Sequence, residues 1–482
     1  MKNISKLKFL IVCLVYFTTD LSAQTVNQKI DAIMQKYVAL ELFSGSVLLA
    51  KDGKILYAKA FGDENKSYQI KNTIDTKFNI ASMGKMFTGV SILQLEERGK
   101  LNINDPVSNY LKDFPLGNKI TIFHLLSHTS GVGSYMAHPD YRANRNAFKK
   151  INDLLYIIYG QKLEFENPGK QFSYSNSGLI LLGAIIEKIS GLSYSDYITK
   201  NILEPAKMKN TAMKFGDEIV QHRAMGYMKS ISGEFHNTNF MTSSPFSDGG
   251  ILSTVGDILK FDQALYNSVL LNDVSKQKMF TVVIPKETYG LTFQIEQRHE
   301  NTVVGHSGGM PGFSSYFSRY LKDKYTIIVL SNYDMISKNV THYIEDILYD
   351  AKYELPQPRL NQFIYENRAK IVAIASLQDI SDFIAANNYS LNHPQSLNSI
   401  AYELLSDGKS NLAIKLFKLN THLFPNEANV YDSLGEAYEG NKEYNLALQN
   451  YEKAIEVAKM NSDLSLNSFT ATLERFKKEH SK

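Results

Sequence analysis

Cysteine and tryptophan are almost absent from this sequence. Its 482 residues include one Cys and no Trp. A single thiol excludes a disulfide within the chain and a zinc cluster built on cysteines. Neither sign of charge is in large excess, because the net charge is only +3. No run of Lys or Arg marks a phosphate-binding surface either. We therefore expect no nucleic-acid partner.

The apolar run near the N-terminus is short. Residues 2–8 hold three lysines, residues 9–17 are apolar, and residues 18–23 are small or polar. This order predicts a secretory signal peptide over 1–23, and an apolar run of about nine residues is too short for the roughly 20 that a membrane-spanning helix needs. A retained anchor is the alternative. We expect an exported protein, periplasmic or secreted, with no membrane span after cleavage. Because Cys13 leaves with the signal peptide, the nucleophile of a mature enzyme must be a hydroxyl.

The remaining composition is that of a globular protein, with 44% hydrophobic and 21% charged residues. At roughly 100–200 residues per domain, the length predicts two or three domains. Strand patterns occur at 44–51, 54–61, 302–305, 313–321 and 325–332. Helical patterns predominate between the two early strand patterns, which end at 61, and the three late ones, which begin at 302. We predict an α/β fold in which both ends of the catalytic region form one antiparallel sheet, flanked by helices, with an inserted helical subdomain.

The last part of the chain has a period of 34 residues. Ile400, Leu404, Ala413 and Phe417 recur as Leu434, Tyr438, Ala447 and Tyr451. This pattern resembles a tetratricopeptide repeat, in which small residues let paired helices approach closely. Pro356 and Pro358 mark a linker before it. We predict a catalytic region at 24–355, a linker at 356–375 and all-α repeats at 376–482. The repeats either dock a protein partner or pack on the body as an appendage.

Ser82 and Lys85 form a Ser-x-x-Lys pattern at the start of a predicted helix. The same pattern begins at Ser5, Ser275 and Ser406, so it carries little weight alone. Residues three apart share one face of a helix, which brings the Lys85 ammonium to the Ser82 hydroxyl. A desolvated lysine there accepts the serine proton or holds the alkoxide, and the helix N-terminus offers N–H groups to an oxyanion. The alternative is that Ser82 only caps the helix.

Tyr174 and Asn176 form a Tyr-x-Asn pattern in a polar loop before an apolar helix. A phenol is a poor base at neutral pH unless a cation stabilises its anion, and Lys85 is the candidate cation. The Asn176 amide both donates and accepts, which suits it to hold a substrate amide. The alternative is local turn formation and helix capping.

A third motif, His306-Ser307-Gly308-Gly309, follows a predicted short strand. Glycines at such a place let a substrate lie against an exposed strand edge. The alternative is a hairpin turn that carries an incidental histidine. The chain's other histidines show no metal-ligand spacing, so we expect neither a metal nor a cofactor.

In order and spacing, the three motifs resemble those of the serine β-lactamase and penicillin-binding superfamily. The resemblance is to the class C β-lactamase-like branch, with its DD-peptidases, D-amino-acid peptidases and esterases. Segments 121–131, 248–254 and 305–312 also look like signatures of this family. The resemblance spans roughly residues 28–350.

The resemblance implies roles for these residues. The implied catalytic residues are Ser82, Lys85 and Tyr174, and the implied substrate-binding or oxyanion residues are Asn176, His306, Ser307, Gly308 and Gly309. Ser82 would attack a carbonyl and become the acyl-enzyme, while Lys85 and Tyr174 exchange the proton. The backbone N–H groups of Ser82 and Gly309 would form the oxyanion hole.

His306 departs from the class C β-lactamase pattern, in which a lysine offers a permanent cation to the substrate carboxylate. Histidine has an ordinary pKa near 6.5 and is mostly neutral at pH 7. We therefore expect the rate to change with pH near 6.5, as a limb of the pH–rate profile. The departure favours a DD-peptidase, a D-amino-acid peptidase or an esterase that acts on a small-molecule or peptide substrate. A β-lactamase remains an alternative, as does a catalytically weak penicillin-binding or regulatory protein whose repeats dock a partner.

Overall fold

The computed structural model describes residues 25–241 and 244–480, so the predicted signal peptide lies outside the described residues. The chain divides into two compact units. One takes in the chain up to Met228 together with His236–Pro356, and the other consists of Lys229–Phe235 together with Gln357–Lys482. Each unit has its own hydrophobic core.

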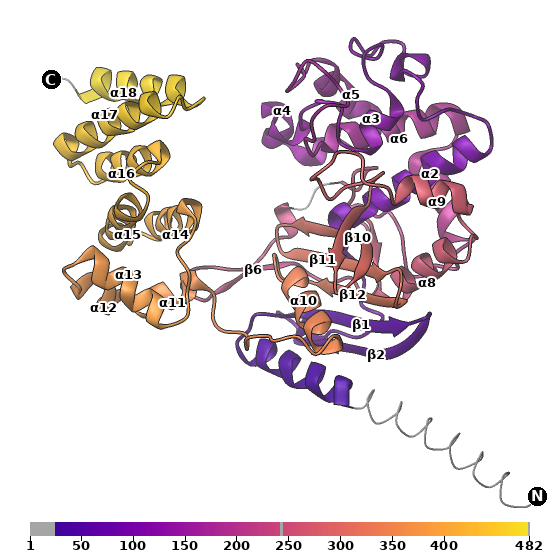
Figure 1. Ribbon diagram of the computed structural model, residues 1–482, viewed down its shortest axis with the longest axis horizontal. Helices are drawn as coiled ribbons and strands as arrows, with labels where there is room; N and C mark the ends of the chain where they lie inside the picture. Colours follow the sequence, from indigo (N-terminus) through magenta and orange to yellow (C-terminus); the bar gives the residue numbers. More distant parts are fainter. Residues whose placement is uncertain (1–24, 242–243, 481–482) are drawn as a thin grey trace, which may run out of the picture. The chain divides into compact units, whose positions relative to one another are not determined.

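A six-stranded sheet forms the centre of the first unit (Figure 1). Its order is β2 (Lys54–Phe61), β1 (Gly45–Lys51), β12 (Tyr325–Ser331), β11 (Phe313–Tyr320), β10 (Asn301–Met310) and β9 (Gln294–Arg298). All neighbouring strands are antiparallel. Gly45 of β1 pairs with Ser331 of β12, which joins the two ends of the region in one sheet. The predicted fold class is therefore confirmed.

Helices cover both faces of this sheet. Ser314 of β11 hydrogen bonds to Ser337 of α10, whereas Arg319 of the same strand pairs with Asp262 of α8. Because side chains alternate along a strand, α10 and α8 lie on opposite faces. The helices of this unit are 25–39, α2 (Lys85–Glu97), α3 (Ile122–Leu126), α4 (Pro139–Ala143), α5 (Ile151–Tyr159), α6 (Asn176–Ser190), α7 (Tyr194–Ile198), α8 (Val255–Tyr266), α9 (Asp273–Met279) and α10 (Ser337–Leu348).

The segment between β2 and β9 contains most of these helices and forms the inserted helical subdomain. Short strands accompany them: β3 (Asp63–Asn65), β4 (Ile70–Lys71), β5 (Phe78–Asn79), β6 (Tyr227–Lys229), β7 (Phe235–Asn237) and β8 (Leu252–Ser253). Among the described residues, no single helix has the length and apolar composition of a membrane span, and only α6 with Tyr194–Leu203, a pair bent by 77°, meets that test.

The second unit is helical, apart from the short stretch Lys229–Phe235. Its helices are α11 (Leu360–Glu366), α12 (Arg368–Ala373), α13 (Leu377–Ala386), α14 (Pro394–Ser406), α15 (Ser410–Leu423), α16 (Ala428–Gly440), α17 (Tyr444–Met460) and α18 (Leu466–His480). Two of them, α11 and α12, lie where the sequence predicts a linker. Ile364 and Ile371 are fully buried there and belong to the hydrophobic core of the helical unit. Burial of these apolar side chains stabilises the segment as part of that unit.

The residues at the 34-residue period are buried within α14 to α17. Their side chains form the core of the helical unit. Gly435 of α16 faces Tyr451 of α17, and a Cβ atom at Gly435 would lie 2.7 Å from the tyrosine ring. The close approach of these two helices therefore depends on the missing side chain.

The stretch Lys229–Phe235, which lies far earlier in the sequence than the helices, contributes to the core of the helical unit. The hairpin of β6 and β7 turns at residues that belong to the helical unit. Ile231, near its tip, is 2% exposed and lies in the same hydrophobic cluster as Ile364 and Leu404. No sequence pattern predicts this insertion.

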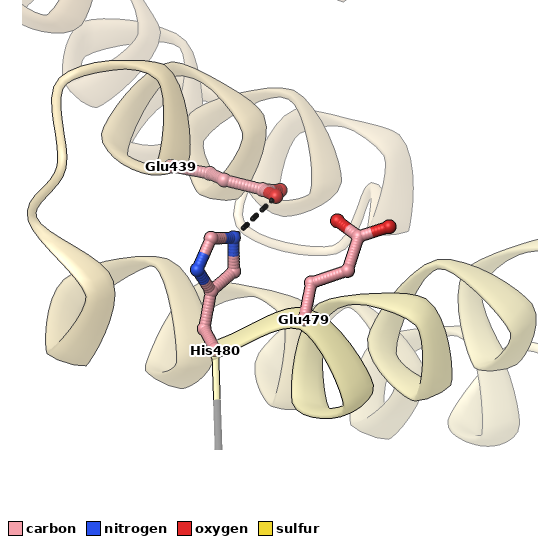
Figure 2. Close-up of side chains that lie close together, drawn as sticks. All are labelled: Glu439, Glu479 and His480. Atoms are coloured by element: carbon pink, nitrogen blue, oxygen red, sulfur yellow. Dashed lines mark hydrogen bonds and ion pairs between the residues drawn. The ribbon is translucent and has the colours of Figure 1, made fainter. Parts of the chain in front are cut away.

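An ion-pair network ties together the last three helices. Figure 2 shows Glu439 of α16 beside Glu479 and His480 of α18. Glu439 accepts hydrogen bonds from Arg475 at 2.8 Å, from the Tyr451 hydroxyl at 2.6 Å and from His480 at 3.1 Å. The Arg475 hydrogen bond is the main cause that lowers the Glu439 pKa to about 2. The carboxylate therefore acts as an acceptor that links α16, α17 and α18.

We expect Gly435→Ala to destabilise the helical unit. The added methyl group would lie 2.7 Å from the Tyr451 ring, and overpacking of this kind costs about 1–3 kcal/mol. Gly440→Ala is the matched control, because its Cβ position in the same helix has no heavy atom within 4 Å. The control should stabilise the helix by up to about 1 kcal/mol. Urea unfolding followed by circular dichroism measures both, and equal free energies of unfolding would contradict this packing.

Candidate active site

Ser82 lies in a short 3-10 turn, Ala81–Gly84, between β5 and α2. The α-helix itself begins at Lys85, slightly later than the sequence pattern predicts. Ala81 has a φ of 47°, in the left-handed region that is strained for a residue other than glycine. Its N–H donates to the Asn79 side chain at 2.9 Å, which holds this turn. The strained turn therefore places Ser82 directly before the N-terminal end of α2.

Lys85 is fully buried beneath Ser82. Its Nζ donates to the Ser82 Oγ at 3.0 Å and to the backbone carbonyl of Asp248 at 2.6 Å. A buried ammonium requires such acceptors, because it has lost its water. The spacing of three residues therefore brings a desolvated amine into contact with a hydroxyl.

Two glycines let neighbouring segments approach this turn. A Cβ atom at Gly308 of β10 would lie 2.1 Å from the Ile80 carbonyl oxygen. A Cβ atom at Gly249 would lie 2.4 Å from the Ala81 carbonyl oxygen, and Gly249 has a φ of 150°. Any larger residue at either place would push strand β10 or the 248–250 turn away from Ser82.

Strand β10 has an open edge beside Ser82. The strand runs through the whole third motif, although the sequence pattern predicts a strand only over 302–305. Its neighbour β9 pairs no further than Gly305, and the Gln294 side chain accepts the Ser307 N–H at 3.1 Å. Because alternate N–H groups point to the same edge of a strand, the Gly309 N–H also faces this open edge.

Tyr174 and Asn176 lie at the start of α6. The Tyr174 ring is 40% exposed, and its centroid lies 4.9 Å from the Lys85 Nζ. Among the described residues, no hydrogen bond joins the Tyr174 hydroxyl to Ser82. The Asn176 Nδ2 donates to the Met136 sulfur at 3.3 Å, while its Oδ1 is buried without a partner in the described part of the chain. That oxygen therefore has an unused acceptor position.

His306 is buried, and both of its ring nitrogens are occupied. Nδ1 donates to the Ser307 carbonyl at 2.5 Å, and Nε2 accepts from the Tyr289 hydroxyl at 2.8 Å. Burial, aided by the nearby Lys85 charge, lowers the His306 pKa to about 3. The expectation that His306 titrates near pH 6.5 is therefore wrong, because sequence reasoning took its solvent exposure for granted.

Sequence reasoning did not single out His128 or Tyr289. His128 is 1% exposed, and its Nδ1 accepts the Ser175 N–H at 3.1 Å. Its ring lies 4.3 Å from the Tyr174 ring and 4.9 Å from the Tyr289 ring, measured between centroids. Burial lowers the His128 pKa well below its ordinary value. This neutral stack supports the loop that carries Tyr174. The only advance signal was the position of His128 inside segment 121–131.

A groove of about 620 Å³ runs along strand β10 and the start of α10. Ser307, Gly308 and Gly309 line it, together with the exposed side chain of Met335 and the partly exposed Met228. The third motif therefore borders this groove, whose lining does not include Ser82, Tyr174 or Asn176.

Comparisons with known proteins identify the family of the chain. The family model described as Beta-lactamase matches residues 26–343. Penicillin-binding protein 4* of Bacillus subtilis (strain 168) is 34% identical over 65% of this chain and 74% of its own length. Protein flp of Staphylococcus aureus (strain MW2) is 31% identical over 72% of this chain and 71% of its own length.

Solved structures show the same fold. A penicillin-binding protein from Bacillus halodurans superposes with a TM-score of 0.61 at 29% identity, covering 65% of this chain and 98% of that one. A D-amino acid amidase from Ochrobactrum anthropi SV3 superposes with a TM-score of 0.58 over 67% of this chain and 99% of its own, and its 21% identity supports the fold alone. The superfamily predicted from the three motifs is confirmed. The chain belongs to the beta-lactamase family and is a serine hydrolase.

Proposed function

We propose that this protein is an exported hydrolase of the class C β-lactamase-like branch that acts on an amide or ester through an acyl-enzyme at Ser82. A DD-peptidase, a D-amino-acid peptidase or an esterase fits best. The observation that carries the proposal is the 3.0 Å contact between the buried Lys85 Nζ and the Ser82 Oγ. Nucleophile and proton acceptor are thus already in hydrogen-bond reach.

The first step forms a bond between the Ser82 Oγ and the substrate carbonyl carbon. For this step Lys85 must be a neutral amine, which takes the hydroxyl proton and exchanges it with Tyr174. The pair then passes the proton to the leaving amine or alcohol as its bond to the carbonyl carbon breaks. The N–H groups of Ser82 and Gly309 stabilise the oxyanion. The position of the Gly309 N–H at the open edge of β10 supports this role. Water then attacks the acyl-enzyme, Tyr174 accepts its proton, and Ser82 is regenerated.

Asn176 supports recognition of an amide. Its Oδ1 is buried and lacks a donor among the described residues, so a substrate N–H would satisfy it. The open edge of β10 offers further backbone groups to an extended substrate. A peptide-like substrate suits both features.

His306 favours a peptidase or esterase over a β-lactamase. With both nitrogens occupied and a pKa of about 3, it offers no cation to a substrate carboxylate at neutral pH. A β-lactam substrate would have to bind without the charge that a lysine supplies at this position.

We also propose that the helical unit is a tetratricopeptide-like stack that docks a protein partner. The burial of the residues at the 34-residue period and the Gly435–Tyr451 contact support the repeat assignment. Export rests on the sequence pattern of residues 1–23.

Ser82→Ala is expected to abolish covalent labelling by a fluorescent penicillin or fluorophosphonate. Hydrolysis should fall by roughly 10,000-fold or more, because the atom that forms the acyl bond is missing. Ser406→Ala is the matched control, since Ser406 starts another Ser-x-x-Lys pattern and is exposed. Labelling of Ser82→Ala, or no labelling of the folded wild type, would contradict the proposal.

A substrate panel distinguishes the possible activities. It comprises a D-alanyl-D-alanine peptide, a D-amino-acid amide, a p-nitrophenyl ester and nitrocefin. We expect the peptide, the amide or the ester to have a higher kcat/KM than nitrocefin, because His306 supplies no cation. Fastest turnover of nitrocefin would instead identify a β-lactamase.

The neutral state of His306 predicts how stability depends on pH. Its folded pKa is about 3 against an ordinary value of 6.5, so between these pH values the unfolded chain binds a proton that the folded chain excludes. The resulting stability is present above pH 6.5 and is lost as the pH falls. Between pH 6 and pH 5, His306→Asn should lose about 1 kcal/mol less than the wild type. The rate profile should show no His306 limb from pH 5 to pH 8.

Urea unfolding at pH 7, 6 and 5 measures this difference. His236→Asn is the control, because His236 is exposed and its replacement should leave the pH dependence unchanged. Parallel pH dependences for His306→Asn and the wild type would show that His306 does take up a proton in the folded protein.

A further inference from the structure

Gln294 closes one end of the open edge of strand β10. It is the first residue of β9, and its backbone pairs with Gly305. Its side chain reaches further along the edge, because Oε1 accepts the Ser307 N–H at 3.1 Å and Nε2 donates to the Ser307 Oγ at 3.3 Å. The side-chain amide therefore takes a place on this edge that the backbone of a paired strand would otherwise occupy.

The carbonyl of Ser307 has a partner within the protein as well. It accepts the His306 Nδ1–H at 2.5 Å, and the Tyr289 hydroxyl donates to the other nitrogen of that ring at 2.8 Å. Both backbone groups of Ser307 are thus already hydrogen bonded. Because alternate residues face the same edge of a strand, Gly309 is the next residue that offers its backbone there. A Cβ atom at Gly309 would have no heavy atom within 4 Å, so the space on that side of the strand is open.

The segment before Gln294 does not continue along β10. The Leu291 N–H donates to the carbonyl of Met279, the last residue of α9, at 3.0 Å. The Thr292 N–H donates to the carbonyl of Leu126, the last residue of α3, at 2.9 Å. Two helices of the inserted subdomain therefore hold this segment, and the position of Gln294 is fixed by them as well as by β10.

The antiparallel register of the sheet determines how much of a substrate fits between Gly309 and Gln294. A substrate in line with β9 would be antiparallel to β10, as β9 itself is. Its scissile residue lies opposite Gly309 when the Gly309 N–H donates to the scissile carbonyl. The leaving group then extends toward Ser307, with its first residue opposite Gly308 and its second opposite Ser307. The second position is the one that the Gln294 side chain fills.

We propose that Gln294 is a specificity-determining residue: its side chain limits the leaving group to one residue, so that the enzyme acts at the C-terminal end of a peptide or on a smaller amide or ester. This inference rests on the proposed function, because it requires acylation of Ser82. The bond that breaks joins the scissile carbonyl carbon to the nitrogen of the last residue, which takes up the serine proton and leaves as a free amino acid. A longer leaving group has to displace the Gln294 amide from Ser307.

The test is competition between two bonds of one peptide, N-acetyl-tri-D-alanine, hydrolysed by the full chain to low conversion. Released D-alanine reports the last peptide bond, and released D-alanyl-D-alanine reports the bond before it. By mass spectrometry, we expect D-alanine to exceed the dipeptide roughly 100-fold in the wild type. In Gln294→Ala this ratio should fall roughly ten-fold, because the Ser307 N–H becomes free to pair with a second residue. Equal release of both products by the wild type would overturn the proposal, even if the variant fails to fold.

Gln297→Ala is the matched control for Gln294→Ala. Gln297 is an exposed glutamine of the same strand, and its side chain hydrogen bonds to Thr302 at 3.1 Å rather than to the third motif. Its replacement should leave the product ratio of the wild type unchanged. An equal fall of the ratio in both variants would show that weakening of β9 changes the ratio, and it would overturn the role of Gln294. An unchanged ratio in a folded Gln294→Ala would do the same.

A pair of esters repeats the test for an enzyme that prefers esters to peptides. In N-acetyl-D-alanyl-D-lactate and N-acetyl-D-alanyl-D-lactyl-D-alanine the acyl group and the scissile ester are the same, and the leaving group has one or two residues. We expect kcat/KM for the shorter ester to be roughly 100-fold higher in the wild type. Gln294→Ala should narrow this difference, and Gln297→Ala should not.

These outcomes also distinguish the inference from the function on which it rests. A folded wild type that a fluorescent penicillin does not acylate contradicts the proposed function. A wild type that is acylated at Ser82 and releases the two-residue groups as readily as the single residues leaves that function intact and overturns the limit set by Gln294. An acylated wild type that hydrolyses neither the peptide nor the esters overturns the limit as well.

Discussion

The fully buried ammonium of Lys85 is the constraint on which the active site depends. A cation without water requires acceptors on several sides, and here they come from separate parts of the chain: the Ser82 hydroxyl, the Asp248 carbonyl and the Tyr174 ring face. The turn before α2, the turn before β8 and the loop before α6 must therefore all converge on one nitrogen atom. Gly308 makes a further approach possible, because it brings β10 against the segment that leads into Ser82.

The same charge determines the state of its neighbours. His128 and His306 are buried close to Lys85, and its charge adds to the burial that lowers both pKa values. The imidazoles then serve as neutral hydrogen-bonding groups: His128 holds the loop before α6 and His306 joins Tyr289 to the backbone of β10. Proton movement is left to the serine, the lysine and the tyrosine. A site of this kind polarises a carbonyl and has no second cation for a substrate carboxylate at the third motif.

Sequence patterns predicted the strands and the residue spacings that depend on neighbours in the sequence. The strand patterns at 44–51 and 54–61 identified β1 and β2, and the three-residue spacing placed Lys85 beside Ser82. The full length of β10 was missed, because Gly308 and Gly309 resemble a turn until a neighbouring strand holds them extended. The neutral state of His306 was missed for a related reason, since burial by distant segments sets its pKa. Tyr289 joins the site only through tertiary contacts and has no motif of its own.

The β6–β7 hairpin makes the helical unit discontinuous in sequence. The chain crosses between the units after Met228, after Phe235 and after Pro356, and Ile231 lies in the helical core. A single proteolytic cut near Pro356 would therefore break one covalent connection and leave two. A gene fragment that begins at Gln357 would encode the helices without the residue that completes their core. A recombination event that joins genes at one point therefore cannot transfer the whole helical unit, because the unit is encoded in two separate stretches of the gene. A module appended at one end of a chain has no such restriction.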